Sequence, residues 1–365
     1  MNAVRDACCG TVAIGMLVAT GFWVAQHPEV ADCGLTGATI SHESSNNVRR
    51  IGWLPDGDRL LTQISGGMNC DRRLILHELA GACRELRVEL AEEFISSMVI
   101  SSDGQHVLVG TFSGRLWWIN LDSSEQSLLM VQKTAITSAA LSNDGRLAAV
   151  ADDRGRVVLC PIRSDEATST TFSEYEDAGT AVSSVSKIVV LAQNLGTSCH
   201  DIRFSEADDR LLCAGNDGSI RLWDVHARQL LQTFRGCSQL VTAVAFLPGN
   251  NRIISACLDD TIRIWDVASG HETWRGQFEC LGIFALALSP DGKTAAWGGF
   301  SGKIQVWNLE QGQMEFVINS SVSTIWSLQF SPDGKSLAAA GRDGAVRIYD
   351  TKSGAQRHEI PVDVI

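Results

Sequence analysis

The stretch Ile262-Arg263-Ile264-Trp265-Asp266 decides the fold, because close copies of it recur at a constant interval. The copies are Ile220-Arg221-Leu222-Trp223-Asp224, Ile304-Gln305-Val306-Trp307-Asn308 and Val346-Arg347-Ile348-Tyr349-Asp350. Their aromatic residues follow one another every 42 positions. Four matches at one interval indicate an internal repeat, and a repeat determines the architecture before any other feature of a sequence.

Weaker copies extend the repeat towards the amino terminus. They are centred on His77, Ile119 and Cys160, at intervals of 42 and 41 residues, and they keep the apolar alternation without the aromatic-acid pair. The interval from Cys160 to Trp223 is 63 residues, which corresponds to one repeat with about half a repeat inserted. The sequence therefore predicts seven units.

Each unit contains apolar runs separated by tight-turn signals. In the last unit, Trp326-Ser327-Leu328-Gln329-Phe330 precedes Ser331-Pro332-Asp333-Gly334, and Asp343-Gly344 precedes the aromatic-acid run. Proline pre-sets φ and Asp-Gly accepts turn geometry, so each cluster closes a hairpin. A further run, such as residues 229–234, lies before the next unit. Four antiparallel strands per unit follow, and the 33 glycines against 7 prolines agree with frequent turns between short strands.

These units resemble the WD-repeat family, in which a unit of about 40–45 residues forms one four-stranded propeller blade. The resemblance covers roughly residues 48–362. It implies an all-β fold, a seven-bladed β-propeller of four-stranded antiparallel blades, preceded here by an apolar amino-terminal segment. The chain departs from the family pattern because no unit has the Gly-His dipeptide ahead of its first strand. Gly236-Cys237 occupies that place before the fifth unit.

In the family, that histidine belongs to a hydrogen-bond chain with a Ser or Thr, a turn Asp and the Trp. The turn Asp is matched here by Asp217, Asp259 and Asp343, and the Trp is matched by Trp223 and Trp265. Because the histidine is missing, we expect other groups or water to bind the three carboxylates.

Two features complete the assignment of strands to blades. Residues 164–183 are acidic, rich in Ser and Thr and without alternation, which predicts a surface insertion. It is either a solvated excursion or a phospho-regulated or partner-binding loop, and residues 187–191 after it are expected to form the outer strand of blade three.

The outer strand of blade seven comes from residues 356–360 or 36–42. The offset of residues 356–360 from Tyr349 matches that of the outer strand of blade four, which favours them.

The amino-terminal segment 7–26 contains no charged residue and has the length of about 20 residues that spans a bilayer. Arg5 precedes it while Glu29 and Asp32 follow, so the positive-inside tendency leaves the amino end in the cytoplasm. Small residues at 19–21 also fit a cleavable signal, and a buried element of a soluble fold is the remaining alternative.

We therefore divide the chain into an anchor or signal segment with its linker, residues 1–34, and the propeller, residues 35–365. A membrane-anchored or exported protein is expected, with the propeller on the non-cytoplasmic side and membrane contact only through the amino-terminal segment. A cytoplasmic protein is the alternative.

Charge and cysteine content exclude several partners and sites. The formal net charge of −12 and pI of about 5.1 oppose attraction to phosphate backbones, and no run of Lys or Arg exceeds Arg49-Arg50. Nucleic acid is therefore not expected as a partner. None of the 11 cysteines falls in a Cys-x-x-Cys pair. Cys160, Cys213 and Cys257 are expected to be core hydrophobes, whereas Cys70 and Cys83 are a candidate pair only in an oxidising compartment.

No motif for a hydrolase elbow, a phosphate-binding loop or a His-Glu-x-x-His metal site occurs. At the channel-proximal position near the start of the first strand, the seven units carry Arg49, Ser96, Thr137, His200, Thr242, Phe284 and Trp326. One histidine and no carboxylate do not make a cage for a hard cation. We expect no metal, no cofactor and no enzymatic activity. The alternative is a propeller enzyme or small-ligand binder that uses the central channel, and a purely structural domain is a third possibility.

In the proteins that this chain resembles, these positions and the turn between the second and third strands lie on the rim that binds partners, so the resemblance implies a partner-binding rim here. Phe284 aligns with Trp326 and Phe300 aligns with Arg342, each pair at the 42-residue interval, so the four are expected to cluster on blades six and seven. Aromatic residues and Arg are enriched in binding hot spots. The sequence thus favours a non-catalytic scaffold that binds an unidentified protein through these four residues, with His200 and Arg49 on the same rim, and a monomeric propeller. The alternative is that Phe284 and Trp326 are core residues packed between blades.

Overall fold

In the computed structural model, the described residues are 47–65, 72–79, 83–86, 94–162, 188–320 and 324–361. They lie in one compact unit, Ser45–Ile365, and form seven four-stranded antiparallel sheets without a helix among them. The anchor or signal segment 7–26, the competing strand 36–42 and the insertion 164–183 lie outside the described residues. No helix in the described ranges is long and apolar enough to cross a membrane.

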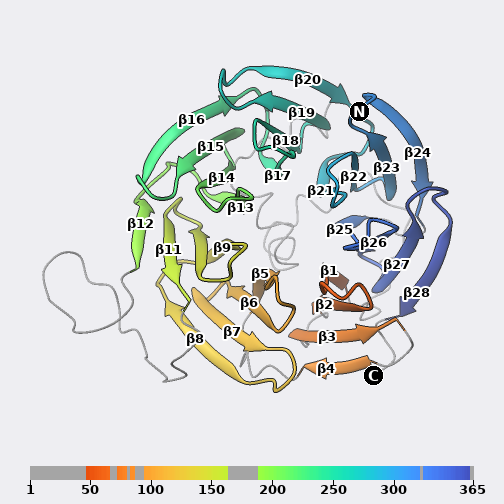
Figure 1. Cartoon of the computed structure of the whole chain (residues 1–365), viewed down its shortest axis with the longest axis horizontal. Helices are drawn as coiled ribbons and strands as arrows, with labels where there is room; N and C mark the ends of the chain where they lie inside the picture. The colour runs from red at the N-terminus through yellow and green to blue at the C-terminus, as the bar shows by residue number, and fades with distance from the viewer. Residues whose placement is uncertain are drawn as a thin grey trace, which may run out of the picture. The chain divides into compact units, whose positions relative to one another are not determined.

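The seven sheets are the blades of a ring (Figure 1), which confirms the predicted seven-bladed, all-β architecture. Blades one to four comprise β1 Asn47–Trp53, β2 Arg59–Ser65, β3 Arg72–Glu78, β4 Cys83–Leu86; β5 Ile95–Ile100, β6 His106–Thr111, β7 Arg115–Asn120, β8 Gln126–Val131; β9 Ile136–Leu141, β10 Leu147–Asp152, β11 Val157–Pro161, β12 Val189–Ala192; and β13 Cys199–Phe204, β14 Arg210–Gly215, β15 Ser219–Asp224, β16 Gln229–Arg235.

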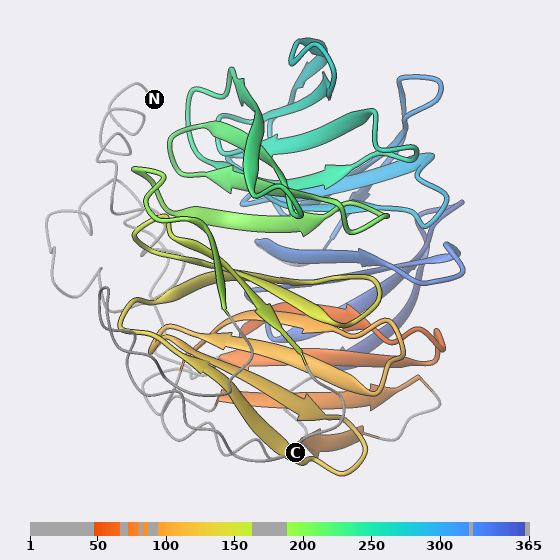
Figure 2. The same cartoon turned by 60° about the vertical axis from the view of Figure 1, so that its left-hand side comes forward.

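Blades five to seven comprise β17 Val241–Phe246, β18 Arg252–Cys257, β19 Thr261–Asp266, β20 Glu272–Gln277; β21 Ile283–Leu288, β22 Thr294–Gly299, β23 Lys303–Asn308, β24 Gln313–Asn319; and β25 Ile325–Phe330, β26 Ser336–Gly341, β27 Ala345–Asp350, β28 Gln356–Pro361. The first strand of each blade lies nearest the axis and the fourth lies at the periphery (Figure 1). In the oblique view of Figure 2, neighbouring blades pack face to face.

The turn between the first two strands of a blade shows why these residues form a hairpin. In blade seven, the Ser331 hydroxyl donates to Asp333 Oδ1 at 2.6 Å and accepts from the Ser336 backbone N at 3.0 Å. Gly334 completes the turn with a φ of 70°, a conformation that costs glycine little. The same Ser-x-Asp bond closes the turns at Ser101, Ser142 and Ser289. The Pro-Asp-Gly signal in the sequence is therefore one version of a repeated Ser-Asp turn.

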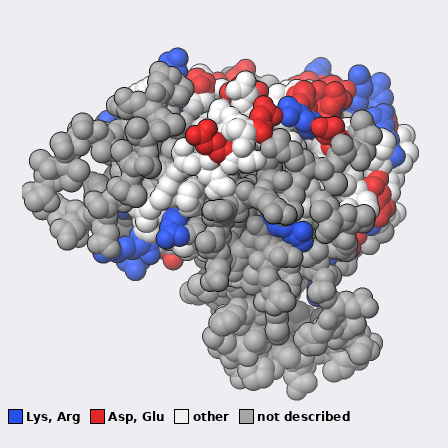
Figure 3. Space-filling model, turned by 90° about the horizontal axis from the view of Figure 1, so that it is seen from below, with Lys and Arg blue, Asp and Glu red and all other residues white. Residues whose placement is uncertain are grey.

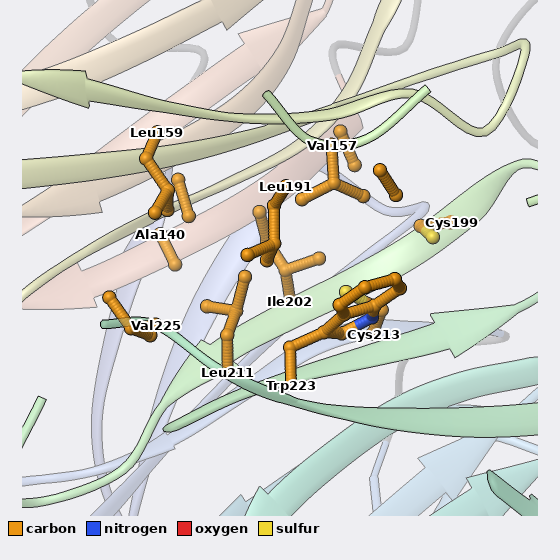
Figure 4. Packing of buried hydrophobic residues seen from close by; sticks show 13 residues of the cluster. Ala140, Val157, Leu159, Leu191, Cys199, Ile202, Leu211, Cys213, Trp223 and Val225 are labelled. Atoms are coloured by element: carbon orange, nitrogen blue, oxygen red, sulfur yellow. The ribbon is translucent and has the colours of Figure 1, made fainter. Parts of the chain in front are cut away.

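The core lies between blades. Ala140, Val157, Leu159 and Leu191 of blade three point toward side chains of blade four, among them Ile202, Leu211, Cys213 and Trp223 (Figure 4). Similar clusters of buried residues join the other neighbouring blades. Because each blade has two apolar faces, its apolar area leaves water only when both neighbours are present. The complete ring is consequently the smallest unit that buries every core face.

Both predicted outer strands are confirmed. β12 pairs with β11 and completes blade three, and β28 pairs with β27 and completes blade seven. Each sheet contains four strands that are consecutive in the chain, so no strand is shared between the first and last blades. Instead, β1 and β25 are joined by side-chain hydrogen bonds. The backbone N of Ile51 donates to Ser327 Oγ at 3.3 Å, and that of Trp53 donates to Gln329 Oε1 at 2.7 Å.

The cysteines follow the prediction only in part. Cys160 and Cys213 are buried thiols, and burial raises the pKa of Cys160 to about 11. Cys257, predicted to be a free core residue, forms a disulfide with Cys237. The prediction was wrong because the partner lies at position 237, in the connection that precedes blade five. Strand alternation indicates burial but gives no information about contacts made by a connecting segment.

Candidate interaction surface

The predicted channel-proximal residues occupy one structural position. In every blade the pairing of the first strand with the second shifts register by one residue near the start of the first strand. The extra residue of this β-bulge in blades one to seven is, in order, Arg49, Ser96, Thr137, His200, Thr242, Phe284 and Trp326. A bulge re-aims the side chain of its extra residue. The seven side chains are therefore displayed together by a repeated backbone device.

Three of the four residues predicted to cluster on blades six and seven do so. The ring of Phe284 lies 4.6 Å from that of Phe300 and 5.3 Å from that of Trp326, measured between centroids. Phe300 and Trp326 are 6.0 Å apart. The interplanar angles of 84°, 57° and 73° are the edge-to-face and tilted arrangements that aromatic pairs prefer. We call Phe284, Phe300 and Trp326 the aromatic cluster.

The aromatic cluster lies at the surface and between two blades at once. Phe300 is 44% exposed, while Phe284 and Trp326 are half-buried. Leu281, two residues before β21, is 71% exposed. Gly282 separates Leu281 from β21, and a Cβ there would approach within 2.8 Å of Leu258 Cδ1. The glycine thus leaves room for apolar side chains to gather at this rim.

The junction between blades six and seven differs from the others at the inner strands. A side chain hydrogen-bonds to the backbone of the neighbouring inner strand in the pairs Gln63–Ile95, Ser97–Ala139, Thr137–Cys199, Asp201–Val244, Thr242–Ile283 and Ser327–Ile51. Among the described residues, no such bond joins β21 to β25. Phe284 and Trp326 contact each other there instead. Their half-burial therefore reflects inter-blade packing, which was the alternative interpretation of these two residues.

The other predicted rim residues lie apart from the aromatic cluster. Arg342 is exposed at the turn after β26, where its backbone N donates to Thr324 O at 3.3 Å, and its side chain has no ring contact with the cluster in the described structure. His200 lies on blade four, where burial lowers its pKa although a hydrogen bond with Asn216 raises it. Arg49 is on blade one, adjacent to blade seven, and burial lowers its pKa.

Charged side chains of both signs occur on the surface of the described residues (Figure 3), and no group of metal-binding side chains lies among them. Acidic and basic side chains are interspersed among the described residues of the face shown in Figure 3. Nowhere in the described ranges do three His, Cys, Asp or Glu side chains gather closely enough to hold a metal ion.

Comparison with known families decides the assignment. The family model described as WD domain, G-beta repeat matches residues 188–224, 228–266 and 312–350. The chain is a seven-bladed β-propeller that contains three matched WD repeats. A search of curated proteins found no match. Each matched repeat of this WD-repeat propeller starts at the outer strand of one blade and ends at the third strand of the next, as residues 228–266 do from β16 to β19. WD-repeat propellers generally bind protein partners as scaffolds without catalysis.

The turn carboxylates of the WD repeats are bound by arginine. Asp217, Asp259 and Asp343 each pair with the arginine four residues later, Arg221 at 2.7 Å, Arg263 at 3.2 Å and Arg347 at 2.5 Å. Ser219 and Thr261 also donate their hydroxyl groups to Asp217 and Asp259. The prediction that groups other than the family histidine satisfy these carboxylates is confirmed. The Asp-x-x-x-Arg spacing repeats in the sequence and was the signal that our sequence reasoning did not use.

The aromatic-acid residues of the WD repeats have structural roles. Trp265 Nε1 donates to Ser255 Oγ at 3.0 Å, whereas Trp223 Nε1 is buried without a partner in the described structure because Cys213 replaces that serine. Trp307 stacks on Trp297, and the Tyr349 hydroxyl bonds to Ser320. The final residue of each motif accepts backbone N–H groups in the next turn, as Asp224, Asp266, Asn308 and Asp350 do.

Proposed function

We propose that this WD-repeat propeller is a non-catalytic scaffold that binds a partner protein through the rim of blades six and seven. The aromatic cluster carries the proposal, because it places three contacting rings from two blades at the surface with Phe300 and the nearby Leu281 exposed. Most of the other large apolar side chains of the blades are enclosed in the inter-blade clusters.

The arrangement has the composition and rigidity of a binding hot spot. Hot spots are enriched in aromatic residues that are held in well-packed surroundings and lose their remaining exposure on binding. Phe284 and Trp326 are fixed by the strands and by each other, so little side-chain entropy is lost when a partner covers them. Arg342, exposed after β26 on blade seven, is the candidate donor for a polar border. The proposed surface therefore has an apolar centre formed by the aromatic cluster.

Truncating Phe300 tests the proposal. Phe300→Ala should weaken partner binding by about 2 kcal/mol or more, roughly thirtyfold, with little change in stability, because this ring is the most exposed of the three. Trp326→Ala should weaken binding and also cost about 3 kcal/mol of folding free energy or more, because the indole packs between blades. Proteins captured from the native host are quantified with wild-type and variant baits, alongside urea unfolding of each bait.

Phe112 provides the matched control. It follows β6 on blade two at the position that Phe300 occupies after β22, and it lies away from the aromatic cluster. Phe112→Ala should retain the partners that Phe300→Ala loses. The proposed surface would be refuted if Phe300→Ala captured the same partners as wild type. It would also be refuted if Trp326→Ala lost stability but kept its affinity for the partner per folded molecule.

We also propose that the propeller functions on the non-cytoplasmic side of a membrane, anchored or exported by residues 7–26. The disulfide between Cys237 and Cys257 supports this location, because disulfides persist in oxidising compartments and are rare in the cytosol.

A further inference from the structure

Leu281 is an exposed leucine held in a backbone conformation that leucine rarely adopts. It lies in the connection 278–282 between β20 and β21, it is 71% exposed, and its φ is 57°. Among the described residues, six that are not glycine have a positive φ, and Leu281 is the only apolar one of the six. Bulky side chains are disfavoured there because Cβ approaches the following carbonyl oxygen. One position therefore combines two unfavourable features, an exposed apolar side chain and a left-handed backbone.

Hydrogen bonds fix the residues on either side of Leu281. The backbone N of Gly282 donates to Asp260 Oδ1 at 2.6 Å, and Asp260 lies in the turn before β19 of blade five. The backbone N of Ser301 donates to Cys280 O at 3.0 Å, and Ser301 lies in the turn before β23 of blade six. Leu281 is therefore held in place from two neighbouring blades.

Asp260 occupies a turn position that is glycine in other blades. The corresponding residues of blades two, three, four, six and seven all have positive φ and are Gly114, Gly155, Gly218, Gly302 and Gly344. Asp260 keeps a positive φ of 65° although it has a Cβ. Its carbonyl oxygen accepts from the backbone N of Phe278 at 2.8 Å, but Gly114 O accepts the matching bond from Gln132 at 2.9 Å. A glycine thus suffices for the backbone bond, and what the aspartate adds is the bond of its carboxylate to Gly282.

Leu281 adjoins the aromatic cluster. A Cβ on Gly282 would lie 2.8 Å from Leu258 Cδ1 and 3.6 Å from Phe284 Cε2, so both side chains lie beside the residue that follows Leu281. Leu258 has the turn position on blade five that Phe300 has on blade six. Leu281 is also the most exposed of the large apolar residues in the described ranges. The rim therefore has a projecting leucine with half-buried apolar side chains next to it.

We propose that Leu281 is an anchor of the partner-binding rim that inserts into an apolar recess of the partner protein, and that Asp260 is the residue that positions it. A projecting apolar side chain fits a concave apolar pocket, and anchors in pockets dominate the energetics of many interfaces. Strained backbone persists where the surrounding structure maintains it, and it clusters at functional sites. Because the backbone of Leu281 is already fixed, little conformational entropy is lost on binding. This inference rests on the proposed function and specifies the surface that the partner presents.

Leu281→Ala tests the anchor. The probe is the protein that the wild-type full-length chain captures most abundantly from its native host, purified and titrated into each variant in a calorimeter. Leu281→Ala should weaken its binding about tenfold or more, because the truncated side chain no longer fills the recess. Leu281→Gly should weaken binding as much without lowering the melting temperature, since glycine adopts a positive φ freely. Leu231→Ala is the matched control, because Leu231 is 50% exposed on β16 of blade four, and it should leave the affinity unchanged.

Two substitutions of Asp260 separate positioning from folding. Asp260→Gly keeps the turn that five other blades have but removes the bond to Gly282, so binding should weaken about fivefold or more. Amide hydrogen exchange of residues 278–284 should become faster in this variant. Asp260→Asn retains an acceptor oxygen and tolerates the left-handed conformation, so it should bind within about twofold of wild type.

Weaker binding by Leu281→Ala and Asp260→Gly, with recovery in Asp260→Asn, supports the inference. Unchanged affinity of Leu281→Ala while Phe300→Ala loses the probe overturns it and leaves the proposed function in place. Unchanged affinity of both variants, or a wild type that captures no protein, overturns the two together. Exchange in Asp260→Gly that equals wild type overturns the positioning role. A dimer of the wild type that Leu281→Ala abolishes in sedimentation assigns the recess to a second copy and overturns the inference as well.

Discussion

The Asp259 carboxylate shows that a residue of the family pattern can be absent while the group it would bind still has hydrogen-bond partners. The family histidine is missing before blade five, yet both carboxylate oxygens of Asp259 are bonded, to Thr261 and to Ser238 and Arg263. The Arg263 side chain is only 4% exposed, so the ion pair is buried. Sequence reasoning predicted a substitute but not its identity. Any of several nearby donors satisfies a carboxylate, and only coordinates distinguish among them.

His77 makes the folding stability of the chain depend on pH. It stands in blade one where Trp265 stands in blade five, is 4% exposed, and its Nε2 lies 2.9 Å from Thr62 Oγ1. Burial lowers its pKa from the ordinary value of 6.5 to about 4. The unfolded chain therefore binds a proton more readily than the folded one between pH 6.5 and 4. The stabilising effect of a neutral His77 is complete above pH 6.5 and is lost as pH falls through that window.

Lowering the pH from 7.5 to 5 should thus reduce the free energy of unfolding by about 2 kcal/mol through His77. Urea unfolding at both values measures the loss. Because carboxylates titrate in the same range, the comparison is made with His77→Gln, which keeps a polar side chain but has no proton to gain. The stability difference between wild type and His77→Gln should shrink by that amount at pH 5. A difference that is the same at both pH values would contradict the assignment.

At the scale of strands, the sequence predicted most of what the structure contains. The recurring aromatic-acid run and the turn signals located β13 to β28, and the offset from Tyr349 identified β28 as the closing outer strand. The bulges were not predicted, although each of the seven predicted channel-proximal positions proved to be one. A bulge depends on how two strands pair, and alternation within one strand does not record the pairing.

Closure of the ring depends on β1 and β25, because no strand is exchanged between blades one and seven. Gln329→Ala should lower the free energy of unfolding by about 1–3 kcal/mol, since it leaves the buried backbone N–H of Trp53 without its acceptor. Gln229→Ala changes the same residue type on the exposed edge strand β16 and should have little effect. Urea denaturation of both variants provides the measurement. Equal stability of the two would show that side-chain bonding at this junction contributes nothing to closure.

For the whole molecule, each repeat joins two blades because it begins with the outer strand of one and continues into the next. Core clusters likewise lie between blades, so neighbouring repeats stabilise each other around the ring. The interval of 42 residues was enough to predict this architecture. The proposed binding surface follows less directly, since the register that assembled the aromatic cluster did not bring the Arg342 side chain into ring contact with it. Register fixes where a residue lies on a blade, whereas its side-chain contacts depend on the neighbouring blade.

The location of the whole chain is the remaining prediction, and it connects the uncharged segment 7–26 with the disulfide. If the segment exports the propeller, Cys237 and Cys257 should be oxidised in the full-length protein from its host. The disulfide should then contribute about 2–4 kcal/mol of stability that a reductant removes. Deleting residues 1–30 should shift the protein to the soluble cytoplasmic fraction with both thiols reduced. Fractionation combined with alkylation of free thiols measures both changes, and Cys257→Ala, which leaves Cys237 unpaired, calibrates the alkylation. The prediction is wrong if the full-length protein fractionates as soluble cytoplasmic protein and its Cys237 is as reactive as in Cys257→Ala. In that case the segment does not export the propeller and the disulfide does not form in the host.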